Sequence, residues 1–151
     1  MAAIKDALDG IDAPAFGLEL HGVGQFGRKH RAARRASARA TQDSYKPHSL
    51  WAAVRPCPEL DHLQRKVDNA IRRVGQPQDA HKFTPHVTLA RLRHPDAEKM
   101  VDWLKYNALY TSVRFGVDSF QLYSSRLTSD GSIYRVEEDY PLRQFDGQTD
   151  D

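Results

Sequence analysis

The sequence predicts an α+β fold, in which helices and antiparallel strands pack in layers. Two observations indicate it: apolar residues recur at helical spacing in some segments and alternate in others, and the last two strand-like segments are joined by a short turn. A closing hairpin favours layered α+β structure over a doubly wound parallel sheet. The length of 151 residues fits a single domain over residues 1–143, followed by an acidic tail at residues 144–151.

The first half of the chain predicts a helix, two strands and a basic insertion. Residues 4–11 carry apolar side chains at helical spacing, and residues 16–23 alternate apolar with polar or small side chains, as a half-buried strand does. Residues 50–54 are apolar throughout and predict a buried strand. Residues 28–47 lack apolar periodicity beyond alanine, so we interpret them as a basic insertion between the two strands.

The second half predicts an amphipathic helix, a strand, a shorter helix and a final hairpin. The long helix spans residues 60–74, and residues 85–92 form the next strand. Asp96 caps the shorter helix, and the hairpin strands cover residues 113–124 and 132–138. The side chains expected to face the interior are Leu60, Leu63, Val67, Ala70, Ile71, Val74, Val87, Leu89, Met100, Val101 and Leu104, with Trp51 and Trp103 also in the core.

Composition places the chain among folded globular proteins. Hydrophobic residues make up 40% and charged residues 28% of the sequence, and no apolar run approaches the ~18 residues that a transmembrane helix needs. The single cysteine, Cys57, cannot form an internal disulfide, which fits a reducing cytoplasm, and no cysteine cluster suits structural zinc. We therefore expect a cytoplasmic protein without a membrane anchor or secretory signal.

The formal net charge is only +2, but positive charge is concentrated in the insertion. Between residues 28 and 39 the chain has six basic residues and no acidic one, which predicts a local contact with a polyanion such as the RNA backbone. A solvated surface loop explains the same residues, and both interpretations stay open. The candidate RNA contacts are Arg28, Lys29, Arg31, Arg34, Arg35 and Arg39.

The segment Phe83-Thr84-Pro85-His86-Val87-Thr88-Leu89-Ala90-Arg91 carries the residues best suited to chemistry. Side chains alternate along a strand, so His86 and Thr88 should project from one face, with Arg91 further along that face. An imidazole exchanges protons near neutral pH, a hydroxyl can hold a phosphate oxygen, and a guanidinium supplies positive charge. We therefore take His86 and Thr88 as candidate catalytic residues and Arg91 as a candidate substrate-binding residue. The tripeptide also arises by chance on amphipathic strands, so it is weak evidence by itself.

This segment resembles the second His-x-Thr signature of bacterial 2'-5' RNA ligases, which belong to the 2H phosphoesterase superfamily. The family signature reads phenylalanine, any residue, proline, histidine, an aliphatic residue, threonine, leucine, alanine and arginine. Further segments are similar to the family in the same order along the chain, with residues 28–47 as an interruption. They are Gly22-Val23-Gly24-Gln25-Phe26-Gly27, Leu50-Trp51-Ala52-Ala53-Val54, residues 120–127 with Gly131 and Tyr134, and Tyr140-Pro141-Leu142.

The resemblance implies a bilobal antiparallel-sheet fold with helices packed outside, in which each lobe contributes one His-x-Thr motif to a cleft. It implies an RNA 2',3'-cyclic phosphodiesterase, a hydrolase that opens cyclic phosphate ends of RNA or oligonucleotides to 2'-phosphomonoesters, with 2'-5' ligation as the reverse reaction. One histidine acts as general base and the other protonates the leaving oxygen, and this chemistry needs no metal or nucleotide cofactor. Tyr123 and Ser125 are expected to border the cleft and contact substrate, with ordinary surface positions as the alternative.

The N-terminal strand and first His-x-Thr motif of the family are missing from this sequence, since none of the other six histidines is followed by that pattern. Three explanations are open: the sequence begins late, the chain binds RNA ends without cutting them, or another chain or side chain supplies the second proton carrier. His21 and His48 are candidates for that carrier, with an ordinary strand or loop histidine as the alternative for each. A chain without these strands would leave a sheet edge open, which predicts self-association.

Overall fold

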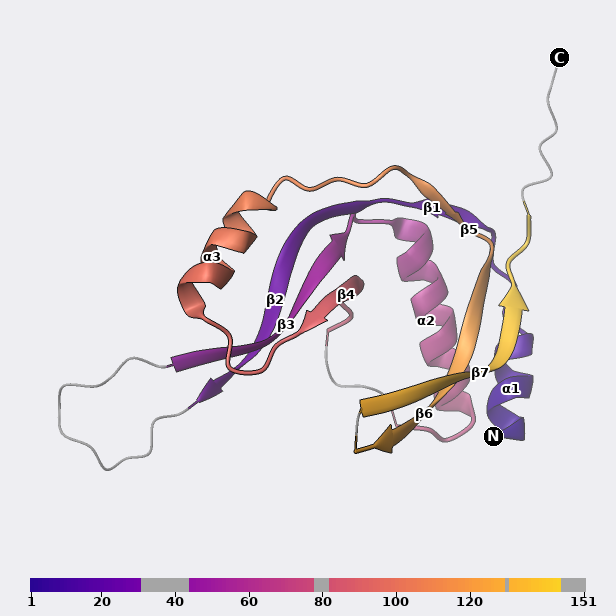
Figure 1. Cartoon of the computed structure of the whole chain (residues 1–151). Coiled ribbons are helices and arrows are strands. Elements are labelled where there is room, and N and C mark those ends of the chain that lie inside the picture. Colours follow the sequence, from indigo (N-terminus) through magenta and orange to yellow (C-terminus); the bar gives the residue numbers. More distant parts are fainter. Residues whose placement is uncertain (31–43, 78–81, 130, 145–151) are drawn as a thin grey trace, which may run out of the picture. The chain divides into compact units, whose positions relative to one another are not determined.

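A computed structural model of the chain describes residues 1–30, 44–77, 82–129 and 131–144, and in these ranges it contains antiparallel strands and three helices (Figure 1). The predicted α+β class is therefore confirmed. The chain divides into two compact units. Unit 1 comprises Met1–Leu18, Pro56–Phe83 and Arg114–Asp151, and unit 2 comprises Glu19–Arg55 and Thr84–Val113.

Unit 1 is built from two helices and two antiparallel strand pairs. Its elements are α1 (Ala2–Asp9), α2 (Pro58–Arg73), the pair β1 (Phe16–Leu18) with β5 (Phe115–Val117), and the pair β6 (Ser119–Thr128) with β7 (Gly131–Pro141). The hydrophobic core forms where the helices meet these strands. The buried core residues are Leu8, Ala13, Phe16, Leu63, Ala70, Tyr140 and Leu142.

The sequence of α2 explains its ends and its buried side. Pro58 lies in the first turn, where a missing N–H group breaks no helical hydrogen bond, and Arg72 and Arg73 lie in the last turn, where positive charge is favourable. Leu63 and Ala70 are buried on one side of the helix. Leu60, Val67 and Ile71 pack against the same core, so five members of the predicted apolar stripe are confirmed, whereas Val74 lies just past the end of the helix.

Unit 2 is built on a three-stranded antiparallel sheet. The strand order is β2 (Leu20–His30), β3 (Ser44–Val54) and β4 (His86–Arg91), so β3 is the central strand. Among the described residues, β4 is therefore an edge strand. The side chains of Leu50 and Ala52 on β3 are buried, as a central strand requires.

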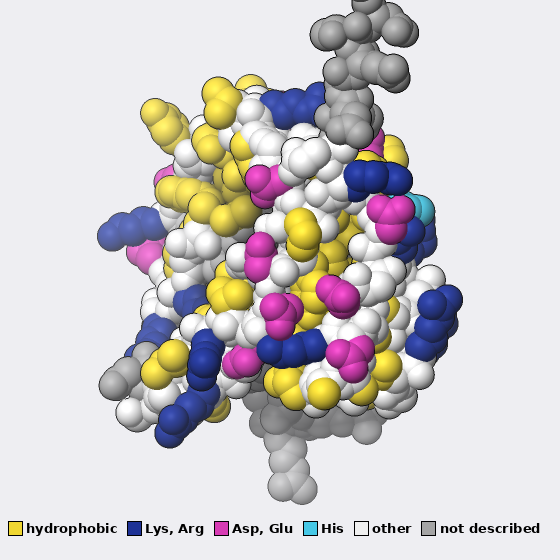
Figure 2. Space-filling view, turned by 90° about the vertical axis from the view of Figure 1, so that its right-hand side faces the viewer, with side chains coloured by type: hydrophobic (Ala, Val, Ile, Leu, Met, Phe, Trp, Pro, Cys, Tyr) yellow, Lys and Arg dark blue, Asp and Glu magenta, His cyan; other side chains and the backbone are white. Residues whose placement is uncertain are grey.

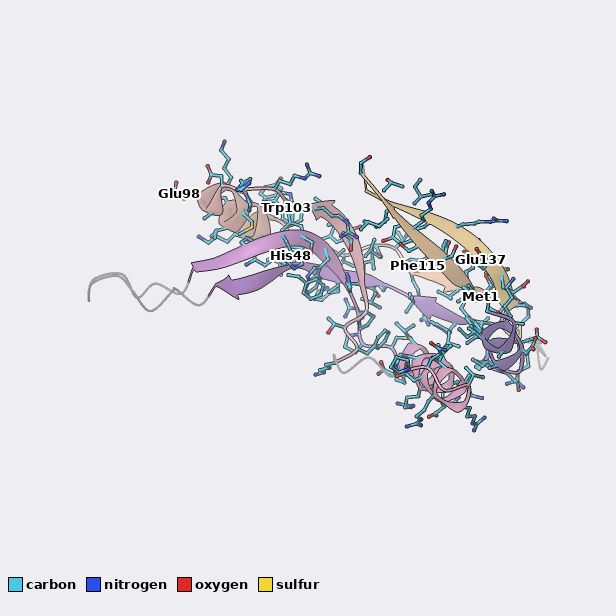
Figure 3. The ribbon with its side chains drawn as sticks, turned by 90° about the horizontal axis from the view of Figure 1, so that it is seen from below. Met1, His48, Glu98, Trp103, Phe115 and Glu137 are labelled. Carbon is cyan, nitrogen blue, oxygen red and sulfur yellow. The ribbon has the colours of Figure 1, made fainter. Side chains whose placement is uncertain are left out.

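α3 (Ala97–Tyr106) completes unit 2 and begins where the sequence predicts. The Asp96 carboxylate accepts hydrogen bonds from two backbone N–H groups of the first turn, at 3.0 and 3.2 Å. Met100 is buried, whereas Val101 is exposed, so the prediction for Val101 is wrong. Neighbouring helical residues differ by about 100° around the axis, which turns Val101 away from the covered side. Trp103 is half-buried on the side of α3 toward the strands (Figure 3).

Two predicted strands are each divided in the structure. The segment 16–23 separates into β1 and β2 at Glu19, and the segment 113–124 separates into β5 and β6 at Asp118. Each piece pairs with a different partner: β1 pairs with β5, β2 with β3, and β6 with β7. The alternation of side chains continues across both breaks, so the pattern alone does not reveal the change of partner.

β2 and β3 extend into the segment that was predicted to be an insertion. Their ladder continues from Gly27 opposite Pro47 to His30 opposite Ser44, so the two ends of the predicted insertion form strands. Main-chain hydrogen bonds hold this part of the hairpin together, and they require no apolar face. Residues 31–43 lie outside the described residues, as do residues 145–151 of the predicted tail.

The surface carries charges of both signs. On the face seen in Figure 2, Lys and Arg side chains are interspersed with Asp and Glu, with hydrophobic side chains between them. The described helices include none that is long and apolar enough to cross a membrane. Exposed hydrophobic side chains gather on β6 and β7, at Tyr123, Leu127, Ile133, Tyr134 and Val136.

Replacing Tyr140 by phenylalanine tests how this core responds to pH. Burial, and then the negative charge of Glu138, raise the pKa of the Tyr140 hydroxyl above its usual value of 10.0. Above about pH 10 the unfolded chain ionises at this residue while the folded chain does not. The free energy of unfolding should therefore fall as the pH rises from there toward the folded pKa.

Tyr140→Phe should lower the free energy of unfolding by about 1 kcal/mol or less at neutral pH, because only one long hydrogen bond, 3.4 Å to the Lys5 carbonyl, is lost. At about pH 11 the variant should lose less stability than the wild type. Urea unfolding of both proteins at the two pH values measures the difference. An equal alkaline loss in both proteins would contradict the prediction.

Candidate active site

The pairing of β4 with β3 fixes which side chains share a face with His86. His86 lies opposite Ala53, and Thr88 lies opposite Trp51. Residues that lie opposite each other in an antiparallel pair project from the same side of the sheet. His86, Thr88, Ala53 and Trp51 therefore form one face, as the sequence predicted for the first two.

A β-bulge in β4 brings Arg91 to the same face. Thr88 and Ala90 are two residues apart, but their partners Trp51 and Leu50 are adjacent, so Leu89 is the extra residue. Strict alternation would turn Arg91, three residues after Thr88, to the opposite face. The bulge turns Arg91 back to the face of His86, where it lies opposite Ser49.

The same geometry corrects two predictions about β4. Val87 and Leu89 are 45% and 51% exposed, so neither faces the core as predicted. Leu89 occupies the bulge, which leaves it without a partner across the ladder. Val87 lies opposite the buried Ala52, but it belongs to the edge strand and has a strand neighbour on only one side among the described residues.

The His86 ring is exposed, and a hydrogen bond to the backbone two residues earlier holds it in place. Its Nδ1–H group donates a hydrogen bond to the Thr84 carbonyl at 2.7 Å. In the neutral imidazole this contact places the proton on Nδ1 and leaves the lone pair on Nε2. Nε2 is therefore the atom that can take up or release a proton.

Two aromatic side chains from the other two strands of the sheet flank His86. The ring of Phe26 lies edge-to-face with it at a centroid distance of 4.9 Å, and Trp51 lies at 6.0 Å. Phe26 and Trp51 also contact each other, at 5.2 Å. Such contacts are favourable and restrict the orientations of the imidazole. Trp51 is half-buried beside the candidate site, with its indole Nε1 atom buried, so the predicted core position is confirmed only in part.

Gly24 makes room for the Trp51 indole. The two residues lie opposite each other in the ladder of β2 and β3, and a Cβ atom on Gly24 would lie 2.3 Å from Cζ2 of Trp51. Real Cβ atoms do not approach other atoms so closely, so a larger residue would displace the ring. Sequence reasoning missed this aromatic support, because it depends on the register between three strands.

The two histidines considered as second proton carriers lie in different places. His48 lies on β3 (Figure 3), five residues from Ala53, which corresponds to about 16 Å along a strand. His21 lies in a bulge of β2, where it and Gly22 together face Ala53 across the ladder. The sheet therefore brings His21, but not His48, to the level of His86.

The remaining candidate residues belong elsewhere in the chain. Tyr123 and Ser125 are exposed on one face of β6 in unit 1, and the Tyr123 hydroxyl donates to Oε1 of Gln121 at 2.6 Å. Arg28 and Lys29 belong to the end of β2, and nothing is described of their side chains. The other candidate RNA contacts, Arg31, Arg34, Arg35 and Arg39, lie outside the described residues.

A cavity of about 590 Å³ lies in unit 1 and contains none of the candidate site residues. Near it, the Cys57 thiol donates to Oε2 of Glu59 at 3.4 Å, and burial raises the pKa of that thiol. The carboxyl of Glu59 has a lowered pKa, mainly because its own backbone N–H group donates to it. Cys57 is therefore a protonated thiol at neutral pH. In the described parts of the chain no cluster of three His, Cys, Asp or Glu side chains is arranged to hold a metal ion.

Comparison with known proteins identifies relatives. The family model of the 2'-5' RNA ligase superfamily matches residues 1–128. An RNA 2',3'-cyclic phosphodiesterase of Thermotoga maritima is 29% identical over 125 residues, which cover 82% of this chain and 56% of that protein. One of Aquifex aeolicus is 33% identical over 105 residues, which cover 66% of this chain and 54% of that protein. The chain thus spans little more than half the length of these relatives.

Solved structures show the same fold. E. coli LigT, solved in complex with 3'-AMP, gives a TM-score of 0.64 at 20% identity, over 93% of this chain and 67% of that one. The protein TT0787 of Thermus thermophilus gives a TM-score of 0.63 at 19% identity, over 94% of this chain and 70% of that one. These likenesses confirm the predicted fold class.

Gly24→Ala tests the support of His86 by Trp51. The added methyl group must displace the indole, so the variant should lose about 1–3 kcal/mol of stability, as overpacked sites do. NMR should show the His86 ring protons moving, because the ring currents of Trp51 and Phe26 no longer act at the same distance. Gly116→Ala is the matched control, since nothing lies within 4 Å of the position that its methyl group would take, and it should stay within about 0.5 kcal/mol of the wild type. Unchanged His86 signals in Gly24→Ala would refute the argument.

Proposed function

The chain belongs to the 2'-5' RNA ligase superfamily, and on this basis we propose that it acts as an RNA 2',3'-cyclic phosphodiesterase. The observation that carries the proposal is the hydrogen bond of His86 Nδ1 to the Thr84 carbonyl, which leaves the Nε2 lone pair for proton transfer on the same sheet face as Thr88 and Arg91. Two relatives with this activity in their names support it. The substrate would be RNA or an oligonucleotide that ends in a 2',3'-cyclic phosphate.

The reaction fits the chemistry of this face. Water attacks the phosphorus of the cyclic phosphate, the bond from phosphorus to the 3' oxygen breaks, and a 2'-phosphomonoester remains. One proton leaves the water and one is delivered to the 3' oxygen. His86 Nε2 can serve either transfer, because the Thr84 carbonyl keeps its other nitrogen occupied.

Thr88 and Arg91 suit the charge of the phosphate. A hydroxyl and a guanidinium both donate hydrogen bonds, and the negative charge on the phosphoryl oxygens increases as water attacks. Both side chains are exposed on the His86 face. For 2'-5' ligation, the 5' hydroxyl of a second RNA would replace water as the nucleophile. Its oxygen bonds to phosphorus and its proton leaves, the bond from phosphorus to the 3' oxygen breaks, and the 3' oxygen takes up a proton.

The second proton transfer needs a group on the opposite side of the phosphorus. The sequence contains a single His-x-Thr motif, and this observation supports an alternative in which the chain binds RNA ends without cutting them. Binding would then rely on Thr88, Arg91 and the basic residues near the end of the β2–β3 hairpin.

Two other expectations stay predictions. The expected cytoplasmic location rests on the single cysteine of the sequence, which cannot form an internal disulfide. Self-association is supported by the β6–β7 pair, whose outer edges have no further strand among the described residues and whose exposed side chains include Leu127 and Tyr134.

His86→Ala distinguishes the enzyme from the binding module. If His86 transfers a proton, the variant should lose ~10²–10⁴-fold of the rate at which 2',3'-cyclic nucleotides are hydrolysed, without losing its fold. Chromatographic detection of the 2'-phosphomonoester measures this rate. His62→Ala, which removes an exposed histidine from α2, is the control and should retain the rate.

The two hypotheses give different results in this assay. A rate that depends on His86 supports the phosphodiesterase. Absent hydrolysis in the wild type, combined with salt-dependent binding of RNA ends, supports the binding module. Equal rates in the wild type and His86→Ala would exclude His86 as the proton carrier.

A further inference from the structure

In unit 2, four side chains form a polar cluster on the sheet that carries the candidate site. They are Glu19, His21, Arg55 and Thr111. The Arg55 Nη2 atom donates to Oε1 of Glu19 at 3.0 Å and lies 3.3 Å from Nδ1 of His21. The Thr111 Oγ1 atom lies 3.1 Å from the same Nδ1. The side chains of Arg55 and Glu19 are 49% and 28% exposed, so a ligand can reach the guanidinium.

The cluster lies on the face that carries His86. Arg55 follows β3 directly and, by alternation, projects from the same side as Ala53, which lies opposite His86. The contact between Arg55 and His21 shows that His21 projects from that side too. Across the sheet, the order is Thr111, His21, Ala53 and His86. The Cα atoms of the two histidines are thus two strand spacings apart, about 10 Å, with Ala53 at the intervening position of the ladder.

The cluster presents hydrogen-bond donors. A guanidinium cannot accept a hydrogen bond, so Nδ1 of His21 must be the acceptor for Arg55. In the neutral ring the proton of His21 is then on Nε2, the reverse of the arrangement in His86. The Glu19 carboxylate takes one N–H of Arg55 and orients the planar group, and the guanidinium keeps further donors for another partner.

We propose that Arg55 and His21 bind the phosphodiester on the 5' side of the nucleotide whose cyclic phosphate lies at His86. The inference rests on the proposed function and names its substrate class: oligonucleotides of two or more nucleotides rather than mononucleotides. The backbone positions of His21 and His86 are about 10 Å apart, and the side chains of His86 and Arg55 project from the same face, so one nucleotide can contact both. A mononucleotide 2',3'-cyclic phosphate lacks the 5' phosphodiester and gains nothing from the cluster.

The test compares a mononucleotide and a dinucleotide that both end in a 2',3'-cyclic phosphate. In the wild type the dinucleotide should have the higher kcat/KM. Arg55→Ala should reduce the value for the dinucleotide by roughly 10- to 100-fold, the effect of one charge-assisted hydrogen bond, and should leave the mononucleotide unchanged. Arg73→Ala removes an exposed arginine from α2 and should change neither value.

Glu19→Gln separates binding from local structure. It breaks the ion pair but keeps the guanidinium, so the preference for the dinucleotide should persist or increase. If Glu19→Gln loses the preference as Arg55→Ala does, the ion pair acts structurally and the proposal is wrong. Equal losses on both substrates in Arg55→Ala, or no loss on either, would also overturn it.

A binding measurement keeps the inference independent of turnover. The affinities for a mononucleotide and a dinucleotide that carry a terminal 3'-phosphate can be measured by NMR titration in the wild type and in Arg55→Ala. A preference for the dinucleotide that Arg55→Ala removes supports the subsite, even if the wild type hydrolyses nothing. Equal affinities in the wild type overturn the subsite, even if hydrolysis of cyclic phosphates proceeds.

Discussion

The hydrogen-bonded ladder of β3 with β2 and β4 is the constraint on which the candidate site depends. It arranges one face of unit 2 in levels: His21, Ala53 and His86 at one end, then Gly24, Trp51 and Thr88, then Phe26, Ser49 and Arg91. Each strand contributes only one residue to each level, so the face exists only when the three strands are paired. The chemistry proposed for His86 therefore depends on register, since a shift by one residue would turn the motif to the other side of the sheet.

Local features of the sequence were sufficient to predict the helices, the final hairpin and the candidate motif. A helix is visible in the spacing of its own apolar residues, and α3 begins where Asp96 can accept from its first turn. His86 and Thr88 share a face because alternation acts over two residues. These predictions need no information about partners distant in the sequence.

Apart from Val101 on α3, the errors and omissions concern the pairing of strands. Glu19 and Asp118 mark points where one extended segment changes partner, and side-chain alternation passes through both without a signal. Arg91 reaches the His86 face only through the bulge at Leu89, which depends on the neighbouring strand. The contacts of Phe26, Trp51 and Arg55 likewise join residues that are far apart in the chain, so composition and spacing could not reveal them.

The position of β4 at the edge of its sheet has a consequence for heat tolerance. Among the described residues this strand is bonded to a single neighbour, and weakly held segments open with a smaller free energy than the whole molecule. If β4 detached from β3, the side chains of His86, Thr88 and Arg91 would lose their positions together, while the rest of the structure stayed folded. Any activity that depends on His86 would then disappear below the melting temperature, because this short strand separates before the rest of unit 2 unfolds.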